Sequence, residues 1–478
     1  MDKPWLQNYD KRVPPSLGYP VLPLDHFLLH AAHKYPRRTA VIYSAPSGSR
    51  LTATHLTYQQ INQSVNHFAA GLQQQGVKKG DRVALALPNC PQFVIAAFAA
   101  WRLGGIVVCL NPFSRPEDLA HMLDDSGSET LVITDRLQAS VQAILGRTNL
   151  RQVIVSRSTD FLPWPTTLIG RWRNRPTPVP QTQATSRAST ISFRSVLHGK
   201  MSRLKLVEVT PPDTAVILYP HPNAHNQPGV SMTHRNLVSS VTMLTQWLPL
   251  QPGQETSLAV MPFYDAFGLT AVFAAGIANA ATLLLMLNPR DVGQTLQAIE
   301  QFRVTFLPGV PKLFDALIQQ NQGKKSDLSR VRLALSSKSA LTPALRQQFE
   351  AVTNGRLLNA YGLTEAGAVV ALDPEQKTRP DTAGLPLPDT EVQIADVSFG
   401  TAALPIGEIG EIVVRGPQVM AGYWQRPEIT AEVVRTGPDG RSGWLFTGDL
   451  GYLDSQGYLH VTTQRQAPIA RGMNRAQL

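Results

Sequence analysis

The chain has 478 residues, 43% of them hydrophobic, with 44 Lys and Arg against 34 Asp and Glu, which gives a formal net charge of +10. This length is too great for one ordinary hydrophobic core, so two or three packed subdomains are expected. The only cysteines, Cys90 and Cys109, lie in apolar contexts; they exclude a disulfide framework or a zinc site and indicate a reduced, cytoplasmic compartment.

Helical and strand patterns alternate along the first 383 residues. Apolar residues recur at helical spacing over 58–72, and short apolar runs predict buried strands at 82–87, 106–110, 129–134, 215–219 and 304–308. This alternation predicts an α/β fold, with parallel sheets and helices on their faces in two lobes spanning 1–383. Shorter strands, such as 391–394 and 411–414, predict a small β-rich subdomain over 384–462. The N-terminus is polar and lacks the apolar stretch of a secretory signal.

Residues 161–207 form a basic segment rich in Pro, Ser and Thr. It has no acidic residue and eight basic ones: Arg171, Arg173, Arg175, Arg187, Arg194, Lys200, Arg203 and Lys205. Its composition predicts a surface excursion, either a solvated loop or a peripheral contact with the anionic inner face of the membrane. In the second case the apolar residues would enter the interface: Phe161, Trp164, Leu168, Ile169 and Trp172. No nucleic-acid motif accompanies the charge, so no nucleic-acid partner is predicted.

Residues 267–287 are uncharged over a length that would admit a membrane-spanning helix. Gly268, Gly276 and Asn279 interrupt the run, which favours a buried core helix followed by a turn and a buried strand at 280–287.

Two short motifs carry the chemistry that a nucleotide requires. The first, Tyr361-Gly362-Leu363-Thr364-Glu365, offers an aromatic ring for adenine, a hydroxyl for phosphate and a carboxylate for Mg²⁺. The second, Thr447-Gly448-Asp449, offers a carboxylate beside a glycine for ribose hydroxyls. Either motif alone has a structural explanation, since a Tyr-Gly turn with Thr and Glu behind it can simply open a helix.

In this order the two motifs resemble those of the adenylate-forming (AMP-binding) superfamily. Further segments resemble bacterial long-chain fatty-acid CoA ligases, among them 80–84, 87–93, 262–264, 384–391 and 407–417. The resemblance implies the large N-terminal region of that fold, ATP with Mg²⁺, and a long-chain fatty acid as substrate. By position it implies Thr364 and Glu365 as catalytic residues, Glu365 as the Mg²⁺ ligand, and a nucleotide site made of Tyr361, Gly362, Thr364, Asp449 and Arg465.

The loop before the Thr233-His234 helix start departs from the family pattern. A loop that wraps a triphosphate needs inward N–H groups and glycines, and the family's loop ends in Pro-Lys-Gly. Here the corresponding positions read Pro222, Gln227, Pro228 and Gly229, with Pro228 where the family has lysine, so the loop is predicted to be degenerate. His221 and His225 have the spacing of a metal pair but no third ligand, so two solvated loop histidines are expected.

The acyl side keeps more of the family pattern. The resemblance places the acyl pocket at Phe263, Asp265, Gly268, Gly309 and Ala340, with ordinary core packing as the alternative. Asp265 stands at the family's usual histidine, and Ser337 and Lys338 replace small residues beside the adenine.

Past the Asp449 motif, residues 463–478 are interpreted as the remnant of a hinge, without the mobile C-terminal domain that carries the family's second lysine. CoA, which that domain helps to bind, is therefore not firmly implied as a co-substrate. Two hypotheses follow: an ATP-dependent long-chain fatty-acid CoA ligase with impaired activity, or a catalytically inactive derivative that acts as an acyl-binding or interaction protein.

Overall fold

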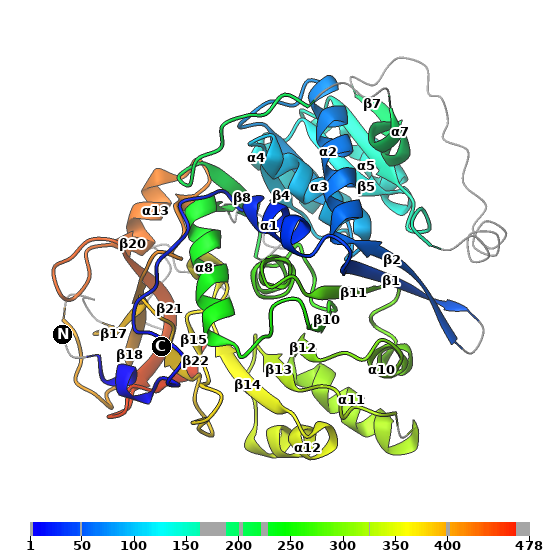
Figure 1. Ribbon diagram of the computed structural model, residues 1–478. Helices are drawn as coiled ribbons and strands as arrows, with labels where there is room; N and C mark the ends of the chain where they lie inside the picture. The colour runs from blue at the N-terminus through cyan, green and yellow to red at the C-terminus, as the bar shows by residue number, and fades with distance from the viewer. Residues whose placement is uncertain are drawn as a thin grey trace.

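The computed structural model describes residues 3–47, 50–162, 188–199, 204–220, 228–324, 326–397 and 402–464. The described strands form three sheets, which we call sheets A, B and C (Figure 1). Sheets A and B are mainly parallel and covered by helices, whereas sheet C is antiparallel and smaller. The α/β fold with a β-rich part predicted from the alternating pattern is confirmed.

Sheet A has nine strands, and its central strands from β1 to β14 run parallel. In spatial order they are β16 (Leu385–Pro386), β15 (Ala371–Leu372), β14 (Arg356–Tyr361), β13 (Leu333–Ser336), β12 (Phe306–Gly309), β10 (Thr256–Leu258), β11 (Thr282–Met286), β1 (Thr39–Ser47) and β2 (Arg50–Thr57). Helices α10 (Val292–Gln301), α11 (Pro311–Lys324) and α12 (Pro343–Thr353) lie on the side of sheet A that faces away from sheet B (Figure 1).

Sheet B has eight strands, parallel from β7 to β8. Their order is β19 (Gly422–Tyr423), β9 (Val230–Thr233), β8 (Thr214–Leu218), β4 (Ile106–Cys109), β3 (Arg82–Ala86), β5 (Thr130–Thr134), β6 (Gln152–Ser156) and β7 (Ser189–Ser192). Its helical elements are α2 (Tyr58–Gln74), α3 (Pro91–Arg102), α4 (Pro116–Ser126), η2 (Asp135–Leu137), α5 (Gln138–Ile144), η3 (Leu145–Arg147) and α7 (Phe193–His198).

Sheet C contains β17 (Glu391–Ala395), β18 (Gly410–Arg415), β21 (Trp444–Leu453), β20 (Val434–Arg435) and β22 (Leu459–Thr463). The remaining helical elements are η1 (Pro4–Asn8), α1 (His26–Lys34), α8 (His234–Trp247), η4 (Gly268–Ala274), α9 (Ala275–Ala278), η5 (Thr364–Ala366) and α13 (Pro427–Val433). The part of the chain that forms sheet C is tied to sheet B because β19, which follows β18, pairs with β9. The Asn236 amide in α8 also donates to the backbone oxygens of Pro417 (2.9 Å) and Val419 (2.8 Å).

The two long helices expected from the sequence, α2 and α8, each begin at a capping box. The Thr57 hydroxyl accepts from the backbone N–H of Gln60 at the start of α2, and Thr233 does the same for Asn236 at the start of α8. In α2 the buried residues recur at helical spacing: Ile61, Val65, Phe68 and Leu72. This periodic face is why the predicted helix over 58–72 is confirmed.

Residues 267–286 lie almost entirely in the core, as the interrupted apolar run predicted, whereas Leu287 is exposed. The π-helix η4 leads through α9 to Ala280, whose φ of +49° makes the turn, and then to the fully buried strand β11. No helix in the described parts of the chain is long and apolar enough to cross a membrane.

The prediction of a loose surface excursion over 161–207 is wrong for residues 188–199. There β7 extends sheet B, and Phe193 of α7 is fully buried with its ring stacked on Phe68 at 4.3 Å. Phe193, Val196 and Leu197 share one face at helical spacing, and the polar composition around them concealed this short amphipathic helix. Leu162 is also buried, whereas residues 163–187, with Trp164, Leu168, Ile169 and Trp172, lie outside the described residues.

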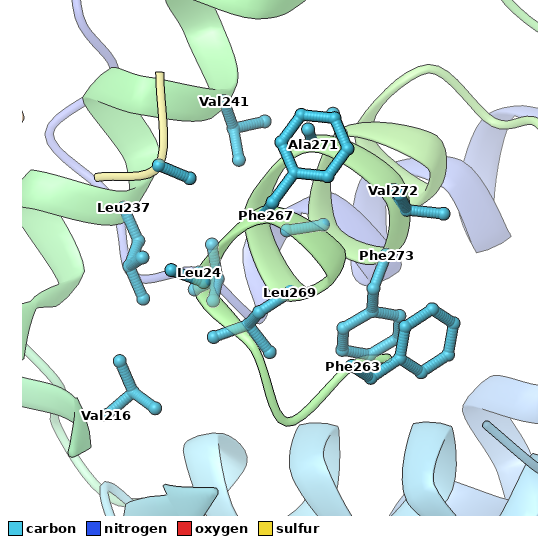
Figure 2. Packing of buried hydrophobic residues seen from close by; sticks show 14 of the residues in the cluster. Leu24, Val216, Leu237, Val241, Phe263, Phe267, Leu269, Ala271, Val272 and Phe273 are labelled. Carbon is cyan, nitrogen blue, oxygen red and sulfur yellow. The ribbon is translucent and has the colours of Figure 1, made fainter. Parts of the chain in front are cut away.

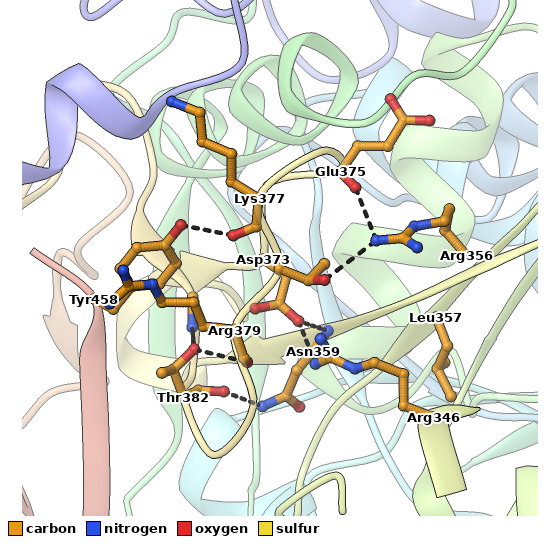
Figure 3. A network of polar contacts seen from close by, with 12 residues as sticks. Arg346, Arg356, Leu357, Asn359, Asp373, Glu375, Lys377, Arg379, Thr382 and Tyr458 are labelled. Carbon is orange, nitrogen blue, oxygen red and sulfur yellow. Dashed lines mark hydrogen bonds and ion pairs between the residues drawn. The ribbon is translucent and has the colours of Figure 1, made fainter. Parts of the chain in front are cut away.

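A polar network fixes strand β14 at the junction of sheets A and C (Figure 3). Buried Asp373 accepts from the Arg346 guanidinium at 2.6 Å and from the backbone N–H of Asn359 at 2.8 Å. Burial raises the pKa of Asp373 to about 6, an effect that Arg346 opposes. From the side of sheet C, the Tyr458 hydroxyl donates to the Lys377 carbonyl at 2.6 Å. The contact of Asp373 with Asn359 holds β14, the strand whose last residue is Tyr361.

Candidate nucleotide and acyl site

The candidate site lies where parallel strands of sheet A end. Strands β12, β13 and β14 are in register, with Gly309 beside Ser336 and Ser336 beside Asn359, so the residues that follow them emerge at one edge. Ligand sites in parallel α/β sheets gather at this carboxyl edge.

The two motifs of the sequence meet directly at this edge. The Tyr361 hydroxyl donates to Asp449 Oδ2 at 2.7 Å, across a separation of 88 residues. Asp449 is fixed within strand β21, where its backbone N–H donates to Thr447 Oγ1 at 3.1 Å and Gly448 has a φ of +77°. Burial, and then the charge of Asp449, raise the pKa of Tyr361, so its hydroxyl stays protonated and can donate.

Glu365 lies beside this pair on η5. Its side chain is buried, and Oε1 accepts from the Tyr423 hydroxyl at 3.0 Å, while Met420 N–H donates to the Glu365 carbonyl at 2.8 Å. Burial raises the pKa of Glu365; the Tyr423 hydrogen bond lowers it, and the charge of Asp449 raises it. Because a neighbouring negative charge disfavours the ionised form of a carboxyl group, Glu365 would ionise more readily with a cation bound to it.

Gly362 and Thr364 complete the first motif. A Cβ at Gly362 would lie 2.2 Å from the Ala368 carbonyl oxygen, so the chain path admits only glycine here. Thr364 is half-buried at the first residue of η5. Arg465, the remaining predicted nucleotide residue, lies outside the described residues.

Of the degenerate phosphate loop, the structure describes Pro228 and Gly229; Pro222, Gln227, His221 and His225 lie outside the described residues. The loop joins the antiparallel pair β8 and β9. A Cβ at Gly229 would lie 2.4 Å from Ile217 Cγ2, and the Gly229 carbonyl accepts from Trp424 N–H at 2.7 Å. Close packing on β8 therefore accounts for this glycine.

The predicted acyl segment around Phe263 packs in the core. The Phe263 ring lies against Phe273 at 4.9 Å and near Phe93 at 5.5 Å, and Figure 2 shows the first of these pairs. Asn89 fixes the backbone, since its side chain accepts from Phe263 N–H at 2.8 Å and donates to Met261 O at 2.7 Å.

The other predicted acyl residues have different environments. Gly268 has no room for a side chain, because a Cβ would lie 1.8 Å from Pro262 O, and Gly309 is buried against α11, whereas Ala340 is exposed. Asp265 forms an ion pair with Lys338, with Nζ 2.6 Å from Oδ2. Both residues of this pair stand where the sequence departs from the family pattern. Which of these residues line an acyl pocket stays a prediction.

The comparisons with known proteins decide the family. The model of the AMP-binding enzyme family matches residues 28–424. The chain belongs to the AMP-binding enzyme family. Among relatives of this AMP-binding chain, the long-chain-fatty-acid–CoA ligase of Bacillus subtilis is 32% identical over 98% of the chain and 81% of its own length. The ligase of the same name from Yersinia pestis is 33% identical over 98% of the chain and 82% of its own length.

Solved structures agree with the sequence comparison. A long-chain-fatty-acid-CoA ligase from Archaeoglobus fulgidus superposes with a TM-score of 0.80 at 25% identity, covering 95% of this chain and 86% of that one. An anthranilate CoA ligase in complex with anthranoyl-AMP has a TM-score of 0.78 at 20% identity, over 93% of this chain and 78% of its own, which shows the fold alone. The predicted N-terminal fold of adenylate-forming enzymes is confirmed.

Sequence reasoning missed Tyr423 in this AMP-binding chain. Tyr423 sits in a strand of two residues, too short for any periodicity, yet its hydroxyl reaches Glu365. The one local signal was the preceding glycine, Gly422, whose φ in the structure is +148°. The ion pair of Asp265 and Lys338 was also missed, because the two residues are 73 positions apart.

Proposed function

We propose that the chain activates a long-chain fatty acid with ATP, through an acyl-adenylate, with CoA as the final acceptor. The observation that carries this proposal is the buried cluster of Tyr361, Glu365 and Asp449 at the carboxyl edge of sheet A. In the proposed arrangement Tyr361 faces adenine, Asp449 accepts from ribose hydroxyls and Thr364 contacts phosphate. CoA is included because the relatives are named CoA ligases.

Glu365 is the residue proposed to hold Mg²⁺. The described residues contain no cluster of three or more His, Cys, Asp or Glu side chains able to hold a metal ion. A single buried carboxylate still fits, because Mg²⁺ in nucleotide sites is usually bound by one or two carboxylates together with substrate phosphates. When bound, the ion would neutralise charge on those phosphates.

We further propose that adenylation is slow in this chain. Pro228 stands at the family's lysine position and has no N–H to donate, and Gly229 packs on β8. Loss of one preorganised donor to a developing negative charge typically costs a factor of about 10² to 10³ in rate. The second candidate function, a catalytically inactive acyl-binding or interaction protein, is favoured by the same loop.

ATP–pyrophosphate exchange with palmitate tests both candidates. We expect exchange that is measurable, depends on palmitate and is abolished by Glu365→Gln, and we expect Pro228→Lys to increase it. Exchange absent from the native chain and from Pro228→Lys, with palmitate still bound, would establish the acyl-binding alternative. Palmitoyl-CoA synthesis by the native chain at about 1 s⁻¹, within the usual enzyme range, would refute the proposal that adenylation is slow.

A cytoplasmic location is proposed from the two free cysteines, Cys90 and Cys109. Peripheral contact with anionic lipid is proposed from the basic residues of 161–207 that lie outside the packed part 188–199: Arg171, Arg173, Arg175, Arg187, Lys200, Arg203 and Lys205. Sedimentation with phosphatidylglycerol vesicles should exceed that with phosphatidylcholine vesicles at low salt and fall as salt is raised. Equal sedimentation with the two lipids at low salt would refute the contact.

A further inference from the structure

An ion pair absent from the family pattern lies at the carboxyl edge of sheet A. Asp265 follows strand β10 and precedes η4, and its Oδ1 accepts from Phe267 N–H at 3.1 Å. Lys338 follows β13 by two residues, and its ammonium lies 2.6 Å from Asp265 Oδ2. The pair therefore joins the loops that follow two strands of the sheet that carries Tyr361.

The pair also lies toward sheet B. Burial raises the pKa of the Cys109 thiol, and the charge of Asp265 raises it further. Cys109 is the last residue of β4 in sheet B. Asn89, which follows β3 of sheet B, accepts from Phe263 N–H at 2.8 Å, so the segment that leads to Asp265 packs at the carboxyl edge of sheet B. A crevice between the carboxyl ends of strands is where ligands of such folds bind.

Lys338 has an unusual backbone for its residue type. Its φ is +73°, a left-handed conformation that side-chain-bearing residues seldom adopt, and Ser337 N–H donates to the Gly309 carbonyl at 3.2 Å just before it. Such strain gathers at ligand sites, where the surrounding structure holds it in place. The Lys338 side chain remains 44% exposed, so its ammonium is open to a ligand.

The charges at this edge call for a cation. Glu365, Asp449 and Asp265 are all acidic, whereas a fatty-acid carboxylate or a nucleotide phosphate needs a positive partner. Position 228, where the family has lysine, carries proline.

We propose that Lys338 is the cation that binds the oxyanion of the ligand, either a fatty-acid carboxylate or a nucleotide phosphate. When the ligand is absent, Asp265 is the counter-ion of Lys338. This inference rests on the proposed function, because it assigns a residue to the same site. It places a lysine on the β13 loop in the role that position 228 cannot fill.

Calorimetric binding to four probes tests the proposal: decanoate against decan-1-ol, and ATP against adenosine. Lys338→Met keeps the length of the side chain and removes the charge. Lys338→Gly also removes the charge and suits the left-handed backbone, so it should fold well. Lys78→Met is the matched control, since Lys78 is an exposed lysine before β3, at the opposite edge of sheet B.

Both Lys338 variants should weaken binding of at least one anionic probe by about 10- to 100-fold, the range of a charge-assisted hydrogen bond, and leave its uncharged analogue unchanged. Weakened decanoate binding identifies the carboxylate as the partner, and weakened ATP binding identifies the phosphate. Asp265→Asn, which removes a competing negative charge, should tighten the same probe several-fold.

Unchanged or tighter binding of both anions by the Lys338 variants would overturn the inference and leave the proposed function intact. Weaker binding of both anions by Asp265→Asn would overturn the counter-ion role. If the native protein bound neither decanoate nor ATP, the proposed function itself would fail, and this inference with it.

Discussion

Replacement of Tyr423 by phenylalanine removes the one side-chain hydroxyl described as donating to Glu365, at 3.0 Å. A hydrogen bond to a charged group contributes about 1.5–3 kcal/mol, and one to a neutral group about 0.5–1.5 kcal/mol. The ionised form of Glu365 therefore loses about 1–1.5 kcal/mol more than the protonated form. At 1.36 kcal/mol per unit, the pKa of Glu365 should rise by about one unit beyond the increase that burial already causes.

The pH profile of ATP–pyrophosphate exchange with saturating Mg²⁺ measures this shift. Because Mg²⁺ requires the ionised carboxylate, the acidic limb of the profile should move upward by about one pH unit in Tyr423→Phe. Tyr19→Phe is the matched control, since it removes a hydroxyl that donates to Asp389 at 2.7 Å, in a different part of the chain. An acidic limb that stayed in place, or moved equally in the control, would refute the reasoning.

Thermal unfolding gives a second measurement that does not depend on activity. Burial raises the folded pKa of Glu365 above its unfolded value, so its contribution to stability is fully present below the unfolded pKa and is lost as pH rises through the folded pKa. Tyr423→Phe raises the folded pKa further. The Tyr423→Phe variant should therefore lose more stability relative to the native chain at pH 8 than at pH 4. The opposite order would contradict the role assigned to the Tyr423 hydrogen bond.

Three further predictions concern packing. Phe193→Ala should lower the free energy of unfolding in urea by about 3–5 kcal/mol, because the side chain is fully buried. Phe113→Ala, at a residue that is 64% exposed, should have little effect. Equal effects would contradict the conclusion that residues 188–199 are packed in the core. Gly268→Ala should cost at least about 1–3 kcal/mol, since its Cβ would meet a backbone oxygen at 1.8 Å, and the same change at Gly146, which has open space, is the control. Lys338→Gly should unfold at the same urea concentration as the native chain or at a higher one. Removing the strain of a left-handed lysine backbone typically gains about 1–3 kcal/mol, whereas losing an exposed ion pair costs about 0–1 kcal/mol. A clear loss of stability would contradict this prediction.

Local patterns predicted the regular elements well, and the motif order predicted the meeting of Tyr361 with Asp449. Apolar spacing marked α2 and β3 because each buries a continuous face. The same reasoning could not find Tyr423, whose strand has two residues, or Phe193, whose helix of six residues is surrounded by polar sequence. Contacts between distant residues, such as Lys338 with Asp265, have no local signature and depend on how the chain folds back on itself.

The pairing of β19 with β9 limits how this protein can be dissected. A cut between residues 383 and 384 lies at the predicted boundary between the lobes and the β-rich part. It would nevertheless break the contact of Tyr423 with Glu365 and leave β9 with an unpaired edge. Expressed alone, the first fragment should therefore aggregate through that edge. Produced together, the two fragments should recombine through it, so split-protein complementation should succeed where simple truncation fails.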